Sequence, residues 1–173
     1  MEEHKRGTSL KTPRILSPIG ERPGMVSFKI DQLRVFVTDA STEIGTAVVR
    51  RLREAGCKVA FVSSDDKSGR NLAQASGARH YPRGFRGSVV DDIAEAWGGI
   101  DVMVVDSGGA MDDNVNVENV ILIGESPRVI CREGIRINAI DTTSLCTREV
   151  AHLCLLLCLK ESACLNGVSL GTF

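Results

Sequence analysis

The residues best placed for chemistry in this sequence lie in a turn at residues 38–45, which reads TDASTEIG. The turn follows a short apolar run and precedes a helical pattern, and ligands of parallel sheets bind beyond the carboxyl ends of such strands. Turns of this kind bind a pyrophosphate when glycines let the backbone approach it and a helix N-terminus faces the anion. Here Gly45 is the only glycine, and the turn also holds the acids Asp39 and Glu43.

The two acids change the chemistry that the turn can perform. Two unit charges about 4 Å apart repel by about 4 kcal/mol at an effective dielectric constant of ~20, so a carboxylate here can weaken pyrophosphate binding about a thousandfold. For Glu43 we favour a structural role, because an acid in the first helical turn stabilises the positive end of the helix dipole. Alternatively, Asp39, Glu43 and Asp106 follow predicted strands at one edge of the sheet and could act as acid and base.

An alternation of strands and helices positions this turn. Apolar runs predict strands at residues 33–37, 58–62, 102–105, 120–123, 135–140 and 168–172. The apolar spacing from Ile44 to Ala55 predicts a helix that ends at Gly56, and further helices are predicted at 89–97 and 149–159. Such an alternation specifies an α/β fold with a doubly wound parallel sheet, Rossmann-like, in three αβα layers.

The composition indicates one domain and predicts which classes of partner the protein does not bind. The chain has 173 residues, a net charge of -1, and 43% hydrophobic residues. We expect a flexible arm over residues 1–30, which are rich in proline, and one Rossmann-like domain over 31–173. The balanced charge and the lack of any apolar run near ~20 residues predict no nucleic-acid or membrane partner and a cytoplasmic location. Cys154 and Cys158 are interpreted as small buried hydrophobes, and no metal site is expected.

Four stretches resemble the short-chain dehydrogenase/reductase (SDR) family, and they occur in the family's order. The turn at 38–45 is similar to the family's Thr-Gly-x-x-x-Gly-Ile-Gly turn. Residues 99–108 (GIDVMVVDSG) resemble the strand that leads into Asn-Asn-Ala-Gly, and residues 134–140 (GIRINAI) resemble its Gly-Ile-Arg-Val-Asn-Ala strand. Residues 149–167 resemble its last helix and the turn into its last strand. The resemblance covers nearly everything after residue 33 and implies a shortened, degenerate SDR fold.

The resemblance also implies where a dinucleotide, NAD or NADP, would bind. The contacting residues would lie in the loops that follow the strands: Thr38, Ser41, Ile44, Gly45, Ser63, Ser107 and Gly108. Asp39 and Glu43 stand at the family's first two glycine positions, so we expect no dinucleotide to bind tightly. Ser63 and Ser64 select neither cofactor, and the acids at 65–66, interpreted as a polar turn and helix start, disfavour the NADP phosphate.

The family's catalytic pair is missing from this sequence. Its members use a serine on one strand and a Tyr-x-x-x-Lys pair on the following helix to exchange a proton with the substrate oxygen. Here the only tyrosine is Tyr81, and no lysine occurs between Lys67 and Lys160. Ser126 could lie near the family's serine, although we interpret it as a helix cap ahead of Pro127.

The segment between Gly108 and Gly134 is short for the family, which places two long helices there. It has room for about one short strand and one short helix, because a parallel crossover needs about a dozen residues or more. We therefore expect exposed surface near residues 109–133. The function we favour is that of a protein without dehydrogenase activity that acts through an unknown protein partner or self-association. The alternatives are an NAD(P)-dependent oxidoreductase with a rearranged site and a cofactor-free isomerase, cyclase or lyase.

Overall fold

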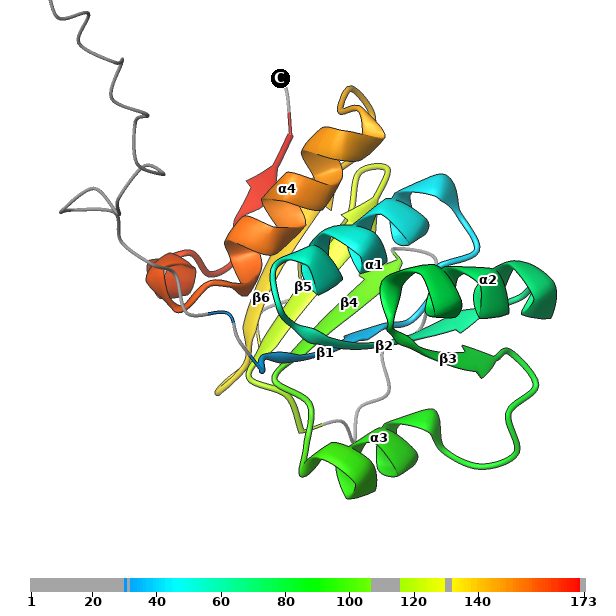
Figure 1. Ribbon diagram of the computed structural model, residues 1–173. Coiled ribbons are helices and arrows are strands. Elements are labelled where there is room, and N and C mark those ends of the chain that lie inside the picture. Colours follow the sequence, from blue (N-terminus) through cyan, green and yellow to red (C-terminus); the bar gives the residue numbers. More distant parts are fainter. Residues whose placement is uncertain (1–29, 31, 107–115, 130–131, 172–173) are drawn as a thin grey trace, which may run out of the picture.

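The computed structural model describes residue 30 and residues 32–106, 116–129 and 132–171 (Figure 1). Most of the expected N-terminal arm lies outside the described residues, as do the candidate site residues Ser107 and Gly108. Ile30 is described, and its side chain is buried in the core of the domain.

The centre of the molecule is one parallel sheet. Its strands are β1 (Arg34–Val37), β2 (Lys58–Ser63), β3 (Arg79–Pro82), β4 (Val102–Asp106), β5 (Asn119–Gly124), β6 (Arg136–Asp141) and β7 (Ser169–Leu170). They lie in the order β3-β2-β1-β4-β5-β6-β7, and every neighbouring pair is parallel. The chain builds outward from β1 to β3 and then crosses back to β4, so the topological switch point lies between β1 and β4.

Helices cover both faces of the sheet (Figure 1). On one face lie α1 (Glu43–Glu54), α2 (Asp66–Ser76) and α4 (Thr147–Cys158), and α4 is followed by the 3-10 helix η1 (Lys160–Cys164). On the other face lies α3 (Val89–Trp97), which buries Ile93 against the sheet. This arrangement confirms the predicted doubly wound α/β fold with three layers.

The sequence did not predict β3, and it predicted only the start of α2, because both elements contain few apolar residues. β3 reads RHYP and lies at the edge of the sheet, where the side chains of Tyr81 and His80 are buried and Arg79 and Pro82 are exposed. α2 buries only Gly69 and Leu72. Its predicted start is confirmed, since Asp65 is the N-cap, and hydrogen bonds from Ser68 and the Lys67 amide lower the pKa of its carboxyl.

The middle of the chain is described in part, since residues 107–115 and 130–131 lie outside the described residues. β5 is present, but the described residues 116–118, 125–129 and 132–135 contain no helix. Their apolar side chains pack on the α3 side of the sheet, where Val117 is buried and Val129 and Ile135 are partly buried. Part of the exposed surface expected near residues 109–133 lies outside the described residues, and in the described part the exposed side chains include no large apolar one.

The GIRINAI stretch that carries part of the SDR resemblance fastens the end of α4 and the last loop to β6. The Arg136 guanidinium and the Asn119 amide both donate to the Leu157 carbonyl, at 3.1 and 2.9 Å, so they satisfy a buried carbonyl in the last turn of α4. The buried Asn138 donates to the Leu165 carbonyl at 2.9 Å and accepts from the Val168 amide at 3.1 Å.

Asp101, from the second matching stretch, forms an ion pair with Arg34 at the amino-terminal edge of the sheet. Its carboxylate accepts from the Arg34 backbone amide at 2.8 Å and from Nε at 2.9 Å, and it also contacts Nη2. The side chains are only 28% and 24% exposed. Hydrogen bonds from Arg34 lower the pKa of Asp101, which burial alone would raise.

We expect Asp101→Asn to lower the free energy of unfolding by about 1–2 kcal/mol at pH 7. A carboxyl group whose pKa is lower in the folded state contributes stability above its unfolded value of about 3.9, and this stability is lost as the pH falls through the folded value. Urea titrations at pH 7 and pH 2.5 should therefore show a difference between variant and wild type that shrinks in acid. Glu95→Gln on α3 is the control, and a pH-independent difference would contradict the ion-pair explanation.

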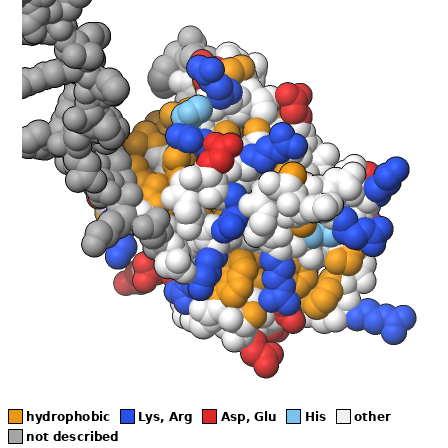
Figure 2. Space-filling view, in the orientation of Figure 1, with side chains coloured by type: hydrophobic (Ala, Val, Ile, Leu, Met, Phe, Trp, Pro, Cys, Tyr) orange, Lys and Arg blue, Asp and Glu red, His pale blue; other side chains and the backbone are white. Residues whose placement is uncertain are grey.

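The surface seen from the α1, α2 and α4 side carries interspersed basic and acidic side chains (Figure 2). Leu156 on α4, at 45% exposure, is the one large apolar side chain that the described residues leave exposed. In this part of the chain no helix has the length and apolar character that crossing a bilayer requires. The apolar face of α4, with Val150, Ala151, Cys154, Leu157 and Cys158, is buried in the core.

Candidate functional site

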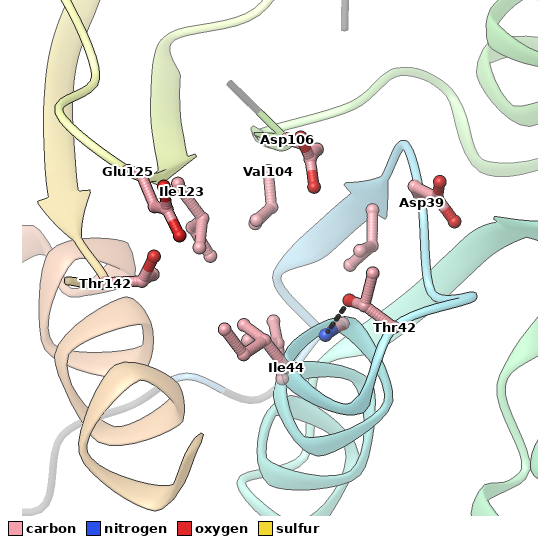
Figure 3. A pocket seen from close by; sticks show the side chains of 12 residues that line it. Asp39, Thr42, Ile44, Val104, Asp106, Ile123, Glu125 and Thr142 are labelled. Atoms are coloured by element: carbon pink, nitrogen blue, oxygen red, sulfur yellow. Dashed lines mark hydrogen bonds between the residues drawn. The ribbon is translucent and has the colours of Figure 1, made fainter. Parts of the chain in front are cut away.

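A cavity of about 400 Å³ opens at the carboxyl ends of β1, β4, β5 and β6, beside the N-terminus of α1 (Figure 3). It is lined by residues from these strands, from α1 and from the loops that follow the strands: Val37, Asp39, Thr42, Ile44, Gly45, Val48, Val104, Asp106, Ile123, Gly124, Glu125 and Thr142. The cavity lies at the switch point of the sheet, which is where α/β sheets of this kind bind ligands.

The cavity combines apolar walls with acidic and hydroxyl side chains. Figure 3 shows Glu125 and Thr142 at the ends of β5 and β6, opposite Thr42 and Asp39 in the β1–α1 turn, with Asp106 near Val104 between them. No lysine, arginine or histidine is among the described residues that line it. The lining therefore favours a ligand that is apolar or positively charged over an anion.

Backbone contacts hold the β1–α1 turn in place. The Thr38 amide donates to the Val104 carbonyl at 2.9 Å, and the Ala40 amide donates to the Val62 carbonyl at 2.8 Å. Thr42 is the N-cap of α1, and its hydroxyl accepts from the Gly45 amide at 3.0 Å. These amides consequently have partners within the protein before any ligand arrives.

Asp39 completes this set of contacts with its side chain. One carboxylate oxygen accepts from the Ser41 amide at 2.7 Å, and the other accepts from the Arg83 guanidinium at 2.8 Å. A bound pyrophosphate at such a turn would itself accept from backbone amides and contact positive charge. Because a carboxylate already holds these donors, the turn does not fit the pyrophosphate of a dinucleotide.

Gly45 has a packing role in the same turn. A Cβ atom at this position would lie 2.4 Å from the Asp39 carbonyl oxygen and 2.8 Å from the Ala40 Cα. Both neighbours are backbone atoms, so no side-chain rotation could relieve the contact. The glycine allows α1 to approach the end of β1, which is one of the roles of glycine in dinucleotide-binding turns.

The predicted site residues divide into two groups. Four of them line the cavity: Asp39, Ile44, Gly45 and Asp106. Five do not: Thr38, Ser41, Glu43, Ser63 and Ser126. The Ser41 hydroxyl oxygen accepts from the Ser64 amide and hydroxyl, each at 2.8 Å, and the buried Ser63 hydroxyl donates to the Asp65 carbonyl at 3.1 Å. Glu43 lies in the first turn of α1, as expected, but it is exposed and outside the lining.

The prediction that Ser126 caps a helix is wrong. It lies in a bend after β5, and the described residues after it, 127–129 and 132–135, form no helix. Its backbone is left-handed, with φ of 46°, and its backbone hydrogen bond with Asp141 contributes to a lowered pKa of that carboxyl group. The described part of the connection between β5 and β6 contains no helix that Ser126 could cap.

Two residues that line the cavity, Glu125 and Thr142, were missed by sequence reasoning. Glu125 comes directly after β5 and Thr142 directly after β6, and the Thr142 amide donates to the Gly124 carbonyl at 3.0 Å. Because the carboxyl ends of parallel strands share one edge, their positions after predicted strands were the signal that could have identified them. Arg83, which neutralises Asp39, follows the strand that was not predicted.

Tyr81, the only tyrosine, has a structural role on β3. Its hydroxyl donates to Asp92 on α3, and the Arg79 guanidinium lies 5.0 Å from the centre of its ring. Burial, followed by the hydrogen bond with Asp92, raises the pKa of Tyr81 far above its usual range. It does not line the cavity, so it does not take the place of the family's catalytic tyrosine.

The cysteine pair on α4 is buried, as predicted for small apolar side chains. Cys154 and Cys158 both lie in the core, and a hydrogen bond with Cys154 together with burial raises the pKa of the Cys158 thiol. Within the described residues no group of three or more His, Cys, Asp or Glu side chains is arranged to hold a metal ion.

The fold of this chain is similar to that of several solved structures, whereas its sequence matches no known family model. No protein-family model and no curated protein sequence matches the chain. A short-chain type dehydrogenase/reductase from Mycobacterium marinum superposes with a TM-score of 0.61 and 16% identity, over 83% of this chain and 94% of that chain. BdcA (YjgI) from E. coli superposes with a TM-score of 0.59 and 19% identity, over 81% of this chain and 97% of that chain.

The chain has the SDR fold. A ribose-5-phosphate isomerase from Brucella melitensis is similar to the same extent, with a TM-score of 0.62 and 12% identity over 83% of this chain and 91% of that chain. At these identities the likeness concerns the fold, and proteins of one fold carry out different functions. The fold alone therefore does not specify what this chain does.

Proposed function

We propose that this chain is a binding protein on the SDR fold without dinucleotide-dependent dehydrogenase activity. The observation that carries the proposal is the engagement of Asp39 by the Ser41 amide and Arg83 in the β1–α1 turn. A pyrophosphate would have to displace the Asp39 carboxylate from these two donors. It would then lie close to the negative charge of the displaced Asp39 side chain. The lack of a Tyr-x-x-x-Lys pair supports the same conclusion, because no proton donor of that kind is present.

The proposal includes contacts with a protein partner or a second copy of the chain. Leu156 is the one large apolar side chain exposed by the described residues, so such contacts would use mainly polar surface in this part of the chain. Interfaces that form and dissociate are about as polar as the rest of a protein surface, so this composition is compatible with a transient partner.

Calorimetry with NAD, NADH, NADP and NADPH tests the proposal directly. We expect no binding at micromolar concentrations to the wild-type protein. Dissociation constants in the micromolar range, or turnover of any alcohol or carbonyl substrate with one of these cofactors, would contradict the proposal. The alternative of an NAD(P)-dependent oxidoreductase with a rearranged site would then be favoured.

A cofactor-free enzyme, such as an isomerase, cyclase or lyase, is the second candidate. The observation that favours it is the presence of Asp106 and Glu125 in the lining of one partly apolar cavity, where carboxyl groups can act as acid and base. Asp39 is less suited to this role because it is already paired with Arg83. This candidate predicts that Glu125→Gln or Asp106→Asn abolishes turnover while the protein remains folded.

A further inference from the structure

We infer that the cavity at the switch point binds a small organic amine with an apolar body, held by the Glu125 carboxylate. This inference deepens the proposed function, and rests on it, because a dinucleotide bound in the same cavity would exclude the amine.

The size and walls of the cavity determine the body of the ligand. At about 400 Å³ it lies in the range of small-molecule sites, which are commonly about 300–1,000 Å³. Ile44 from α1 lies across it from Val104 and Ile123 of the sheet (Figure 3), and Val48 of α1 also lines it. An aliphatic or aromatic group of small size would therefore lose its contact with water against these side chains.

The hydrogen-bond donors of the cavity argue against an anionic group on the ligand. The Ser41 amide at its edge is held by Asp39, and the lining Gly45 and Thr142 amides are held by Thr42 and the Gly124 carbonyl. An anion would have to break these hydrogen bonds, and apart from the positive end of the α1 helix dipole the described lining supplies no positive charge to compensate.

The charge of the lining favours a cation. Arg83 neutralises Asp39 at 2.8 Å, whereas Glu125, on the opposite side, pairs with no basic side chain among the described residues. Figure 3 shows the Glu125 side chain beside Thr142 at the cavity. An ammonium group can donate to the carboxylate and to the Thr142 hydroxyl while its apolar body lies on the strands.

A titration followed by NMR amide shifts tests the inference with three probes of one shape. The probes are 2-phenylethylamine, the neutral 2-phenylethanol and the anionic 3-phenylpropionate, each added to the full chain. We expect the amine to shift the amides of Ile44, Gly45 and Glu125, with about tenfold weaker binding of the alcohol and no binding of the acid. Glu125→Gln should weaken the amine about tenfold and leave the alcohol unchanged, since a hydrogen bond to a charged group is lost.

The control is Glu95→Gln, which makes the same charge change on α3, on the other face of the sheet. Equal binding of the amine by wild type and Glu125→Gln, or binding of the three probes with equal affinity, would overturn the inference.

A parallel titration with NAD separates the two proposals. If neither NAD nor the amine binds, the inference fails and the proposed function stands. Micromolar binding of NAD would contradict the proposed function itself.

Discussion

Replacing Asp39 and Glu43 by glycine is expected to raise the affinity for NAD about a hundredfold over that of the wild type. Removal of the Asp39 side chain releases the Ser41 amide and the Arg83 guanidinium, and both can then bind a phosphate oxygen. Removal of Glu43 takes a second negative charge from the first turn of α1, where the helix dipole favours an anion. Arg83 already cancels part of the repulsion in the wild type, so we expect about 2–3 kcal/mol, or roughly a hundredfold.

Calorimetry of the double variant beside the wild type measures this effect. The variant Asp39→Asn/Glu43→Gln is the matched control, because it removes both charges but keeps both Cβ atoms and the side-chain bulk. If only the glycine variant binds NAD more tightly, the bulk of the two side chains prevents binding in the wild type. If both variants gain the same affinity for NAD, the two negative charges prevent it. A folded glycine variant that binds NAD no better than the wild type would disprove the explanation based on these two positions.

Gly45→Ala is expected to lower the free energy of unfolding by about 2–3 kcal/mol, as overpacking in a rigid site does. The added methyl would lie 2.4 Å from the Asp39 carbonyl oxygen, so the turn and the start of α1 would have to move apart. For a domain of this size, the melting temperature should fall by roughly 4–12 °C. Thermal unfolding followed by circular dichroism measures this change.

Gly84→Ala provides the matched control for Gly45→Ala. No atom lies within 4 Å of the Cβ position at Gly84, and its backbone is not left-handed. We expect its effect to stay within about 0.5 kcal/mol. Equal melting temperatures for the two variants would mean that α1 does not approach β1 as closely as described.

The residues that carry the SDR resemblance have structural roles in this chain. Gly45 permits close packing, Asp101 pairs with Arg34, and Arg136 and Asn138 hold the last helix and loop. The positions that would contact a cofactor hold different groups. Asp39 satisfies its own turn, and Ser63 is buried with its hydroxyl donated to the backbone. This division supports the proposal of a binding protein that uses the fold without its redox chemistry.

The sequence by itself determined the fold through hydrophobic periodicity. The buried strands β1, β2, β4, β5 and β6 were predicted within one or two residues, and α3 over its full range. Apolar runs identified these strands because parallel strands buried on both faces consist mainly of apolar residues. Hydrophobic periodicity failed at β3 and α2, where few side chains are buried and the pattern carries little signal.

The composition of the site depended on the tertiary structure. The sequence identified the β1–α1 turn and its acids, but it gave no means to pair Asp39 with Arg83, which lies after an unpredicted strand. It also did not assign Glu125 and Thr142 to the same cavity as Gly45. These residues meet only because parallel pairing brings the carboxyl ends of β1, β4, β5 and β6 to one edge of the sheet. Local patterns determine strands and helices, whereas contacts between distant loops depend on strand order and register.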